Sequence, residues 1–225
     1  MPRTIAVTGT GEIRVKPDII QITFTLTAKN THYSDMMQQA DAQLSALQAA
    51  VGRAGIRAEQ LKTSDYSVNT EYEHLADENG NYRQIFAGYV CRHMLLLELP
   101  LDMAQLSGVL RAAEDSLTEP EFLITFTVRD RQKVQAQALR AAAEQARRNA
   151  EALAAAAGVQ LGQLLSISNH SIVQPMISPT NYTMLRAKMA DGVCGAGAAI
   201  TPEDIRTQET AELIWEITDA VPEDL

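Results

Sequence analysis

Cysteine, positive charge and long apolar runs are all scarce in this sequence. Cys91 and Cys194 are its two cysteines, and their spacing matches neither a metal site nor a redox motif. We expect two free thiols, while a single disulfide is the alternative that the sequence leaves open. Lysine and arginine number 19 against 28 aspartates and glutamates, and the net charge of -9 repels phosphate backbones and anionic lipid surfaces. We therefore expect no nucleic-acid partner.

No stretch reaches the about 18 consecutive apolar residues that a membrane-spanning helix requires, so we expect no membrane span. Residues 1–4 lead directly into strand-like alternation, without the hydrophobic region of a signal peptide. As the sequence stands, these features predict a cytoplasmic protein. A periplasmic or secreted location is the alternative if an export signal was removed ahead of residue 1.

The chain is long enough to build a substantial core. It has 225 residues, of which 46% are apolar and 21% charged. A chain of this size buries roughly 70% of its unfolded surface, so neither disulfides nor metals are needed for folding. We predict one domain over residues 1–225, with subdomains at 1–100 and 101–225 as the alternative.

Apolar residues at every second position predict strands, and apolar residues spaced three and four apart predict helices. Helices are expected at residues 31–54, 103–117 and 131–157. Residues 174–201 contain two prolines and three glycines and are expected to form a long irregular loop. The expected strands cover residues 5–15, 20–26, 66–72, 84–99, 122–128, 164–173 and 211–217.

These elements predict an α+β fold in which long helices pack on antiparallel sheets. We expect residues 5–15 and 20–26 to form an antiparallel pair around Pro17-Asp18, and a long hairpin to turn at Asn79-Gly80. Two helix ends look alike, because Ala54-Gly55-Ile56 is echoed by Ala157-Gly158-Val159. The echo indicates either pseudo-duplicated strand-helix-strand halves or the glycine that helix ends commonly carry.

The order of several short motifs resembles the SIMPL family. The opening combines alternating apolar residues, a Gly-x-Gly and a Pro-Asp, and similar segments continue to about residue 217. The segments that carry the resemblance are Ile5, Val7, Gly9, Gly11, Ile13, Val15, Pro17, Asp18, Gly55-Ile56, Leu61-Lys62-Thr63-Ser64, Gly88-Tyr89, Ala157-Gly158-Val159, Leu161-Gly162 and Ser166-Ile167-Ser168.

The resemblance implies an α+β structure, a tendency to oligomerise, and bacterial relatives that are often exported and associated with envelope or oxidative stress. It does not imply an enzyme. The sequence departs from the family in two respects, because it shows no export signal and because residues 174–200 follow no family pattern.

Two glycine-containing motifs are candidates for chemistry. Gly9-Thr10-Gly11 lacks the third glycine and the following helix of a nucleotide loop, so we interpret these glycines as room for a neighbouring side chain or as a strand bulge. Cys194, between Gly192 and Gly195, loosely resembles a nucleophile elbow. No strand clearly precedes it and nothing identifies His170 as its base, so we expect a glycine loop with a free thiol.

The remaining polar candidates do not form a site by spacing. His32, His74, His93 and His170 match no zinc pattern, and the acidic pair Asp77-Glu78 suits a solvated hairpin tip. We therefore predict no catalytic, cofactor-binding or metal-binding residues.

Two apolar features favour contacts instead. The alanine-rich face of helix 131–157 is expected to pack on the sheet rather than form a subunit interface, and Met176, Met184 and Met189 suit an adaptable surface or the core edge. The predicted function is non-enzymatic, namely homo-oligomeric assembly or interaction with a protein partner, linked to a stress response. The alternative is a module that binds a small ligand or peptide beneath residues 174–201. A Cys194-based activity is the weakest hypothesis.

Overall fold

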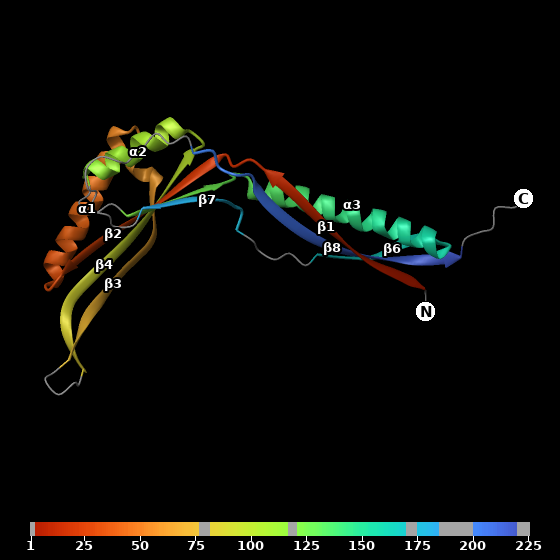
Figure 1. Cartoon of the computed structure of the whole chain (residues 1–225), viewed down its shortest axis with the longest axis horizontal. Coiled ribbons are helices and arrows are strands. Elements are labelled where there is room, and N and C mark those ends of the chain that lie inside the picture. The colour runs from red at the N-terminus through yellow and green to blue at the C-terminus, as the bar shows by residue number, and fades with distance from the viewer. Residues whose placement is uncertain (1–2, 77–81, 117–120, 170–174, 185–199, 220–225) are drawn as a thin grey trace, which may run out of the picture. The chain divides into compact units, whose positions relative to one another are not determined.

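The computed structural model describes residues 3–76, 82–116, 121–169, 175–184 and 200–219. Figure 1 shows its helices and strands in chain order. The elements are β1 (Thr4–Val15), β2 (Ile19–Asn30), α1 (Tyr33–Arg53), the short 3-10 helix η1 (Ala58–Gln60), β3 (Leu61–Ala76), β4 (Tyr82–Pro100), α2 (Met103–Ser116), β5 (Phe122–Thr127), α3 (Arg131–Ala157), β6 (Val159–Asn169), β7 (Ile177–Met184) and β8 (Ile205–Asp219).

The chain forms two compact units, each assembled from separate segments. The first, here the three-strand unit, comprises Met1–Pro17, Val128–Pro179 and Glu203–Leu225, and the second, the five-strand unit, comprises Asp18–Thr127 and Thr180–Pro202. The chain therefore passes between units near residues 17, 127, 179 and 202 rather than near residue 100.

The five-strand unit has the strand order β3-β4-β2-β5-β7 and carries α1 and α2. Strand β2 lies at its centre, and its even-numbered residues from 20 to 28 are buried while the odd-numbered ones between them are half-buried. The same core contains Leu47 and Val51 of α1 and Leu106 and Val109 of α2. Both helices thus cover the same face of the sheet, as the period of the apolar residues predicts.

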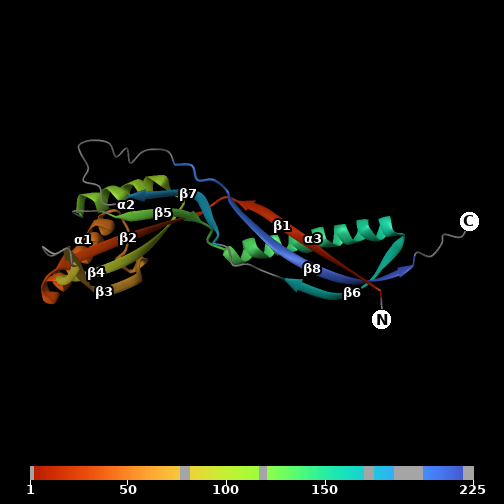
Figure 2. The ribbon, with the colours of Figure 1, turned by 60° about the horizontal axis from the view of Figure 1, so that its bottom comes forward.

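The three-strand unit has the strand order β1-β8-β6 and a single helix, α3. Asp130 begins this helix by accepting a hydrogen bond at Oδ1 from the Lys133 amide at 2.8 Å, and Gly158 ends it with a left-handed φ of 67°. Figure 2 shows α3 running along β1 and β8. Its buried face consists mainly of alanines at every fourth position, which are Ala138, Ala142, Ala146, Ala150 and Ala154.

The α+β class, the family-typical antiparallel sheets and the helices predicted from periodicity are confirmed. The hairpin of residues 66–72 with 84–99 is confirmed as the antiparallel pair β3–β4, although its Asn79-Gly80 turn lies outside the described residues. The alanine face of α3 packs on its own sheet, as expected.

The predicted antiparallel pair of residues 5–15 and 20–26 is wrong. Strand β1 pairs with β8, whereas β2 pairs with β4 and β5, so the two strands lie in different sheets. Pro17 lies between them, and a proline removes a backbone donor while lacking the positive φ that tight hairpin turns favour. After it, the Asp18 amide donates to the Thr127 carbonyl of the five-strand unit at 3.0 Å.

The boundaries of the later elements also differ from expectation. Residues 174–201 are not irregular throughout, because residues 177–184 form β7 at one edge of the five-stranded sheet. Strand β6 begins at Val159 rather than near Leu164, directly after the glycine that ends α3. Its regular alternation is broken by two register shifts against β8, which is why the sequence pattern located only its second half.

The echo between the two helix ends has a local backbone origin. Gly55 and Gly158 both adopt positive φ, at 83° and 67°; Gly158 directly follows α3, and Gly55 follows the C-cap residue Ala54 of α1. This conformation costs glycine little and other residues more, so the shared triplets are explained by helix termination. The chain then differs, since Gly158 leads directly into β6 while Gly55 leads into a short 3-10 turn before β3.

Candidate surface groove and strand edge

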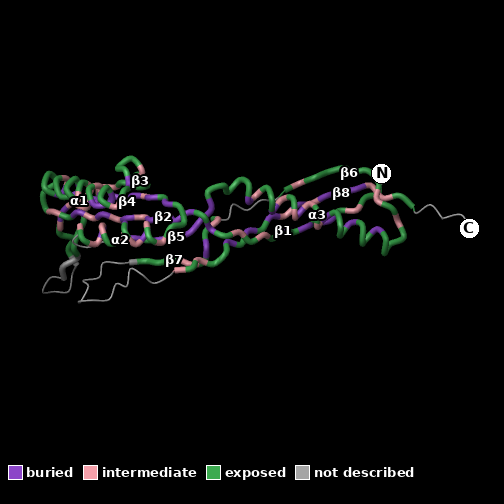
Figure 3. The backbone as a smooth tube through the Cα atoms, turned by 90° about the horizontal axis from the view of Figure 1, so that it is seen from above, coloured by how far each residue is buried: buried purple, intermediate pink, exposed green. Residues whose placement is uncertain are grey.

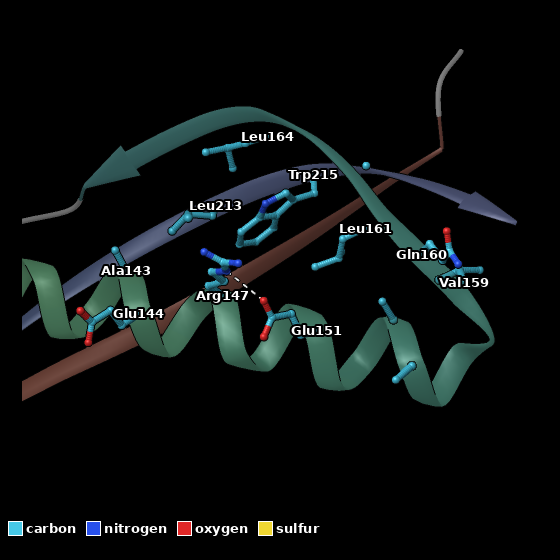
Figure 4. Close-up of a pocket in the computed structure, with 13 residues that line it drawn as sticks. Ala143, Glu144, Arg147, Glu151, Val159, Gln160, Leu161, Leu164, Leu213 and Trp215 are labelled. Atoms are coloured by element: carbon cyan, nitrogen blue, oxygen red, sulfur yellow. Dashed lines mark hydrogen bonds and ion pairs between the residues drawn. The ribbon is translucent and has the colours of Figure 1, made fainter. Parts of the chain in front are cut away.

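A groove lies between α3 and β6. Its volume is about 880 Å³, and it lies wholly within the three-strand unit. Figure 4 shows Trp215, Leu213, Leu161 and Leu164 on the strands and Arg147 and Glu151 on the helix. We call it the α3–β6 groove, and its lining residues are Ala143, Glu144, Arg147, Glu151, Ala154, Ala155, Val159, Gln160, Leu161, Gly162, Leu164, Leu213 and Trp215.

The groove follows from the widths of the elements. Neighbouring strands lie about 4.8 Å apart, and a helix with its side chains is about 10 Å wide. One helix therefore covers about two strands of a three-stranded sheet. Helix α3 packs mainly on β1 and β8, so the same face of β6 is left without a covering helix.

Strand β6 presents a row of apolar side chains on this uncovered face. Leu164 lies opposite Trp215 in the sheet register, and Ile167 lies opposite Leu213. Because directly opposite residues point to the same side of a sheet, Leu164 and Ile167 share the face on which Leu213 and Trp215 are buried. Leu164 and Ile167 are nevertheless 39% and 66% exposed, and Figure 3 shows β6 as largely exposed.

The helix wall of the groove is polar at its rim. Arg147 Nε donates to Glu151 Oε1 at 2.9 Å, and Arg140 Nε donates to Glu144 Oε1 at the same distance about two turns earlier along the helix. All four side chains are more than half exposed, so each pair stabilises the helix only weakly.

The free edge of β6 differs from the other sheet edges that the structure describes. Strand β1 carries Glu12 and Arg14, β3 carries four charged residues from Lys62 to Glu73, and β7 contains Pro179. Such residues discourage pairing with another chain. Strand β6 has eleven residues with neither a charge nor a proline, and its unpaired side faces away from β8.

A family model described as SIMPL, protein of unknown function (DUF541), matches residues 5–215. The chain belongs to the SIMPL family. This confirms the resemblance that the ordered motifs indicated. Comparison with curated proteins gave no match. Because the family description carries no activity, the role of this SIMPL chain has to be argued from its own surfaces.

The Gly-x-Gly of the SIMPL chain is a packing site rather than a phosphate loop. Gly9 and Gly11 lie in the middle of β1 and face the backbone of α3 near Ala142. A Cβ on Gly9 would lie 2.8 Å from the Ala146 Cα, closer than real Cβ atoms approach a neighbour. The Thr10 amide between them bonds to the Gln145 side chain. These glycines do make room for a neighbour, but that neighbour is helix backbone rather than the expected side chain, and β1 pairs with β8 without a bulge at either glycine.

Cys91 is a buried structural thiol in the five-strand unit. It is 1% exposed and packs with Met36 and Ala40 of α1. The Tyr66 hydroxyl covers this cluster and donates to Met37 Sδ at 3.6 Å. A hydrogen bond with the Cys91 side chain, more than burial, raises the pKa of Tyr66 to about 12.

The described histidines do not converge on one site. His93 is buried and its Nε2 lies 2.9 Å from Thr63 Oγ1, with burial lowering the pKa of the imidazole. His32 is exposed just before α1, and its Nδ1 lies 3.2 Å from Thr31 Oγ1. Within the part of the chain that the structure describes, no three His, Cys, Asp or Glu residues are grouped to hold a metal, and no helix is long and apolar enough to span a membrane.

Several predicted features lie outside the described residues. They include Cys194 with Gly192 and Gly195, His170, Asp77-Glu78, Met189, and the side chains of His74 and Met184. Met176, the first of the three late methionines, is half-buried against Val128 and Ile205. It therefore lies at the edge of the core, which is one of the two places expected for it.

Sequence reasoning missed the α3–β6 groove. The helix and part of β6 were recognised, but the exposure of Leu164 and Ile167 depends on which strands α3 covers. One signal was present in the sequence. From Val159 to Asn169 no charged residue and no proline occurs, which is unusual for a strand at a sheet edge.

Proposed function

We propose that this SIMPL protein is a non-enzymatic assembly protein that associates with copies of itself through the edge of β6. The observation that carries the proposal is an eleven-residue edge strand without charge or proline, whose Leu164, Leu165 and Ile167 are 39%, 47% and 66% exposed. An edge of this kind is a template for strand addition. Pairing would satisfy its free backbone groups and remove these side chains from water.

Light scattering across a concentration series tests this proposal. Association through β6 predicts a mass of two or more chains that falls toward 24.6 kDa on dilution, or that stays multimeric if the contact is tight. A mass of one chain at all concentrations up to several hundred micromolar contradicts the proposal.

A second candidate function, the binding of a small apolar ligand or peptide, is favoured by the α3–β6 groove. Its volume of about 880 Å³ lies within the range of ligand sites, and its floor includes Trp215, the single tryptophan of the chain. In this candidate function the ligand would occupy the groove of the three-strand unit, whereas the sequence suggested a site beneath residues 174–201. An aliphatic or aromatic probe that raises the melting temperature and shifts Trp215 emission would support binding, and a panel without either effect would count against it.

The link to oxidative or envelope stress rests on the family resemblance alone. Deletion of the gene in its source organism should then increase sensitivity to peroxide or to envelope-damaging agents, and complementation should restore resistance. The absence of enzymatic activity and the location in the cell stay predictions.

A further inference from the structure

The apolar row on β6 is symmetric about one residue. Leu161 lies three positions before Leu164, and Ile167 lies three positions after it. In the sheet register Leu161 lies opposite Ile217, Leu164 opposite Trp215, and Ile167 opposite Leu213. On each side of Leu164, an advance of three residues along β6 thus corresponds to an advance of two residues along β8. One extra residue on each side keeps all three side chains on the face toward α3, where Leu161 packs against the core and Leu164 and Ile167 are exposed.

This symmetry bears on how a second copy can pair with β6. In an antiparallel pair, the residue numbers of any two opposite residues add up to the same total. A two-fold axis at Leu164 therefore places Leu164 opposite the partner's Leu164. Leu161 then lies opposite the partner's Ile167. Each opposed pair is aliphatic and lies on one face, and the extra residues on the two strands also face each other.

Self-pairing of this strand also meets no electrostatic obstacle. Strand β6 contains no charged residue, so two copies bring no like charges opposite one another. The other edge of the same sheet, β1, carries Glu12 and Arg14. Charge therefore favours β6 over β1 as the edge at which the sheet is extended.

From these observations, and resting on the proposed function, we infer that the partner of the β6 edge is the β6 edge of a second copy. The two strands run antiparallel about a two-fold axis at Leu164. The resulting sheet has six strands in the order β1-β8-β6-β6-β8-β1, and the contact is isologous, with the same surface used by both chains.

Disulfide trapping tests the register. In a Cys194→Ser background, which retains the buried Cys91, Leu164→Cys should cross-link into dimers on treatment with diamide, which takes up the two electrons and two protons released by the thiols. Cβ atoms of directly opposite residues lie about 4.5–5.5 Å apart, close to disulfide geometry. Leu153→Cys, on the exposed side of α3, is the matched control and should remain monomeric on a denaturing gel.

A second pair of variants tests the antiparallel direction. Leu161→Cys alone and Ile167→Cys alone should give few cross-links, because each residue and its own copy lie about 20 Å apart along antiparallel strands. Co-expression of the two variants should give strong heterodimer cross-links. Circular dichroism of the reduced variants establishes that each one is folded.

The outcomes separate this inference from the proposed function. If native chains associate by light scattering but Leu164→Cys does not cross-link above Leu153→Cys, the two-fold register is wrong while assembly stands. Efficient cross-linking of Leu161→Cys alone would likewise overturn it, because that result requires either a different antiparallel register or parallel strands. Monomers at every concentration would remove the inference and the proposed function together.

Discussion

Gly9 of β1 lies so close to Ala146 of α3 that a Cβ added to the glycine would stand 2.8 Å from the Ala146 Cα. The contact joins a strand without a side chain to a helix whose buried face is mostly alanine. Together they bring helix backbone onto sheet backbone over the centre of the three-strand unit. This close approach leaves α3 mainly over β1 and β8, with β6 only partly covered.

Gly9→Ala should destabilise the protein, because the added methyl meets helix backbone, which cannot move like the end of a flexible side chain. We expect a loss of about 1–3 kcal/mol or more in the free energy of unfolding, measured by urea denaturation. Gly108→Ala in α2 is the matched control, since its Cβ would meet nothing within 4 Å. That change should be neutral or stabilise by up to about 1 kcal/mol, and equal effects at the two glycines would contradict the packing account.

The sequence predicted most elements and the face each one buries, because those depend on local periodicity. The buried alanines of α3 and the alternation in β2 are examples. It did not predict which strands pair, since β1 and β2 have equally clear patterns but belong to different sheets. Which strands pair is decided by how each strand fits the available helices. Strand β1 is lined by glycine, whereas β2 is lined by isoleucine and phenylalanine. That fit is a property of the assembled fold.

The candidate site was beyond local reasoning for a related reason. Leu164 and Ile167 read as ordinary strand residues, and their exposure follows only from the limited width of α3 and the two register shifts of β6. Trp215 was correctly placed in the last strand, but the groove beside it is formed with residues that precede it by more than fifty positions.

Stability should depend on the protonation of His93. Burial lowers the pKa of this imidazole below its ordinary value of 6.5, so the unfolded chain binds the proton more readily than the folded one. The His93 contribution is therefore fully present above pH 6.5 and is lost as the pH falls through the lower, folded-state pKa. Urea unfolding between pH 8 and pH 4.5 measures the effect.

His93→Gln supplies the control for that titration, because glutamine keeps a hydrogen-bonding group near Thr63 without titrating. The difference in stability between wild type and variant should change with pH below 6.5 and be constant above it. Burial also raises the pKa of the Glu114 carboxyl, but that group is common to both proteins and cancels in the difference. A pH-independent difference would show that His93 does not titrate on unfolding.

Cys91 should behave as an inert thiol in the native protein. It is 1% exposed beneath Tyr66 and α1, and a thiolate must reach solvent to react. In a Cys194→Ser variant we expect an aromatic disulfide reagent to label less than one thiol per chain over minutes, and one after unfolding in guanidinium. Rapid native labelling would place Cys91 at an accessible surface, contrary to the structure.

Assembly through β6 can be tested with one variant, Ile167→Lys. Light scattering measures its mass in solution beside that of wild type at equal concentrations. Ile167 is 66% exposed on the free strand, so lysine there should leave the fold intact while placing a charge in the contact. Leu153→Lys adds the same charge at a 52% exposed site on α3 and serves as the control. If the chains assemble through β6, wild type and Leu153→Lys associate, whereas Ile167→Lys has the 24.6 kDa mass of one chain. An Ile167→Lys protein that associates as wild type does would rule out assembly through β6.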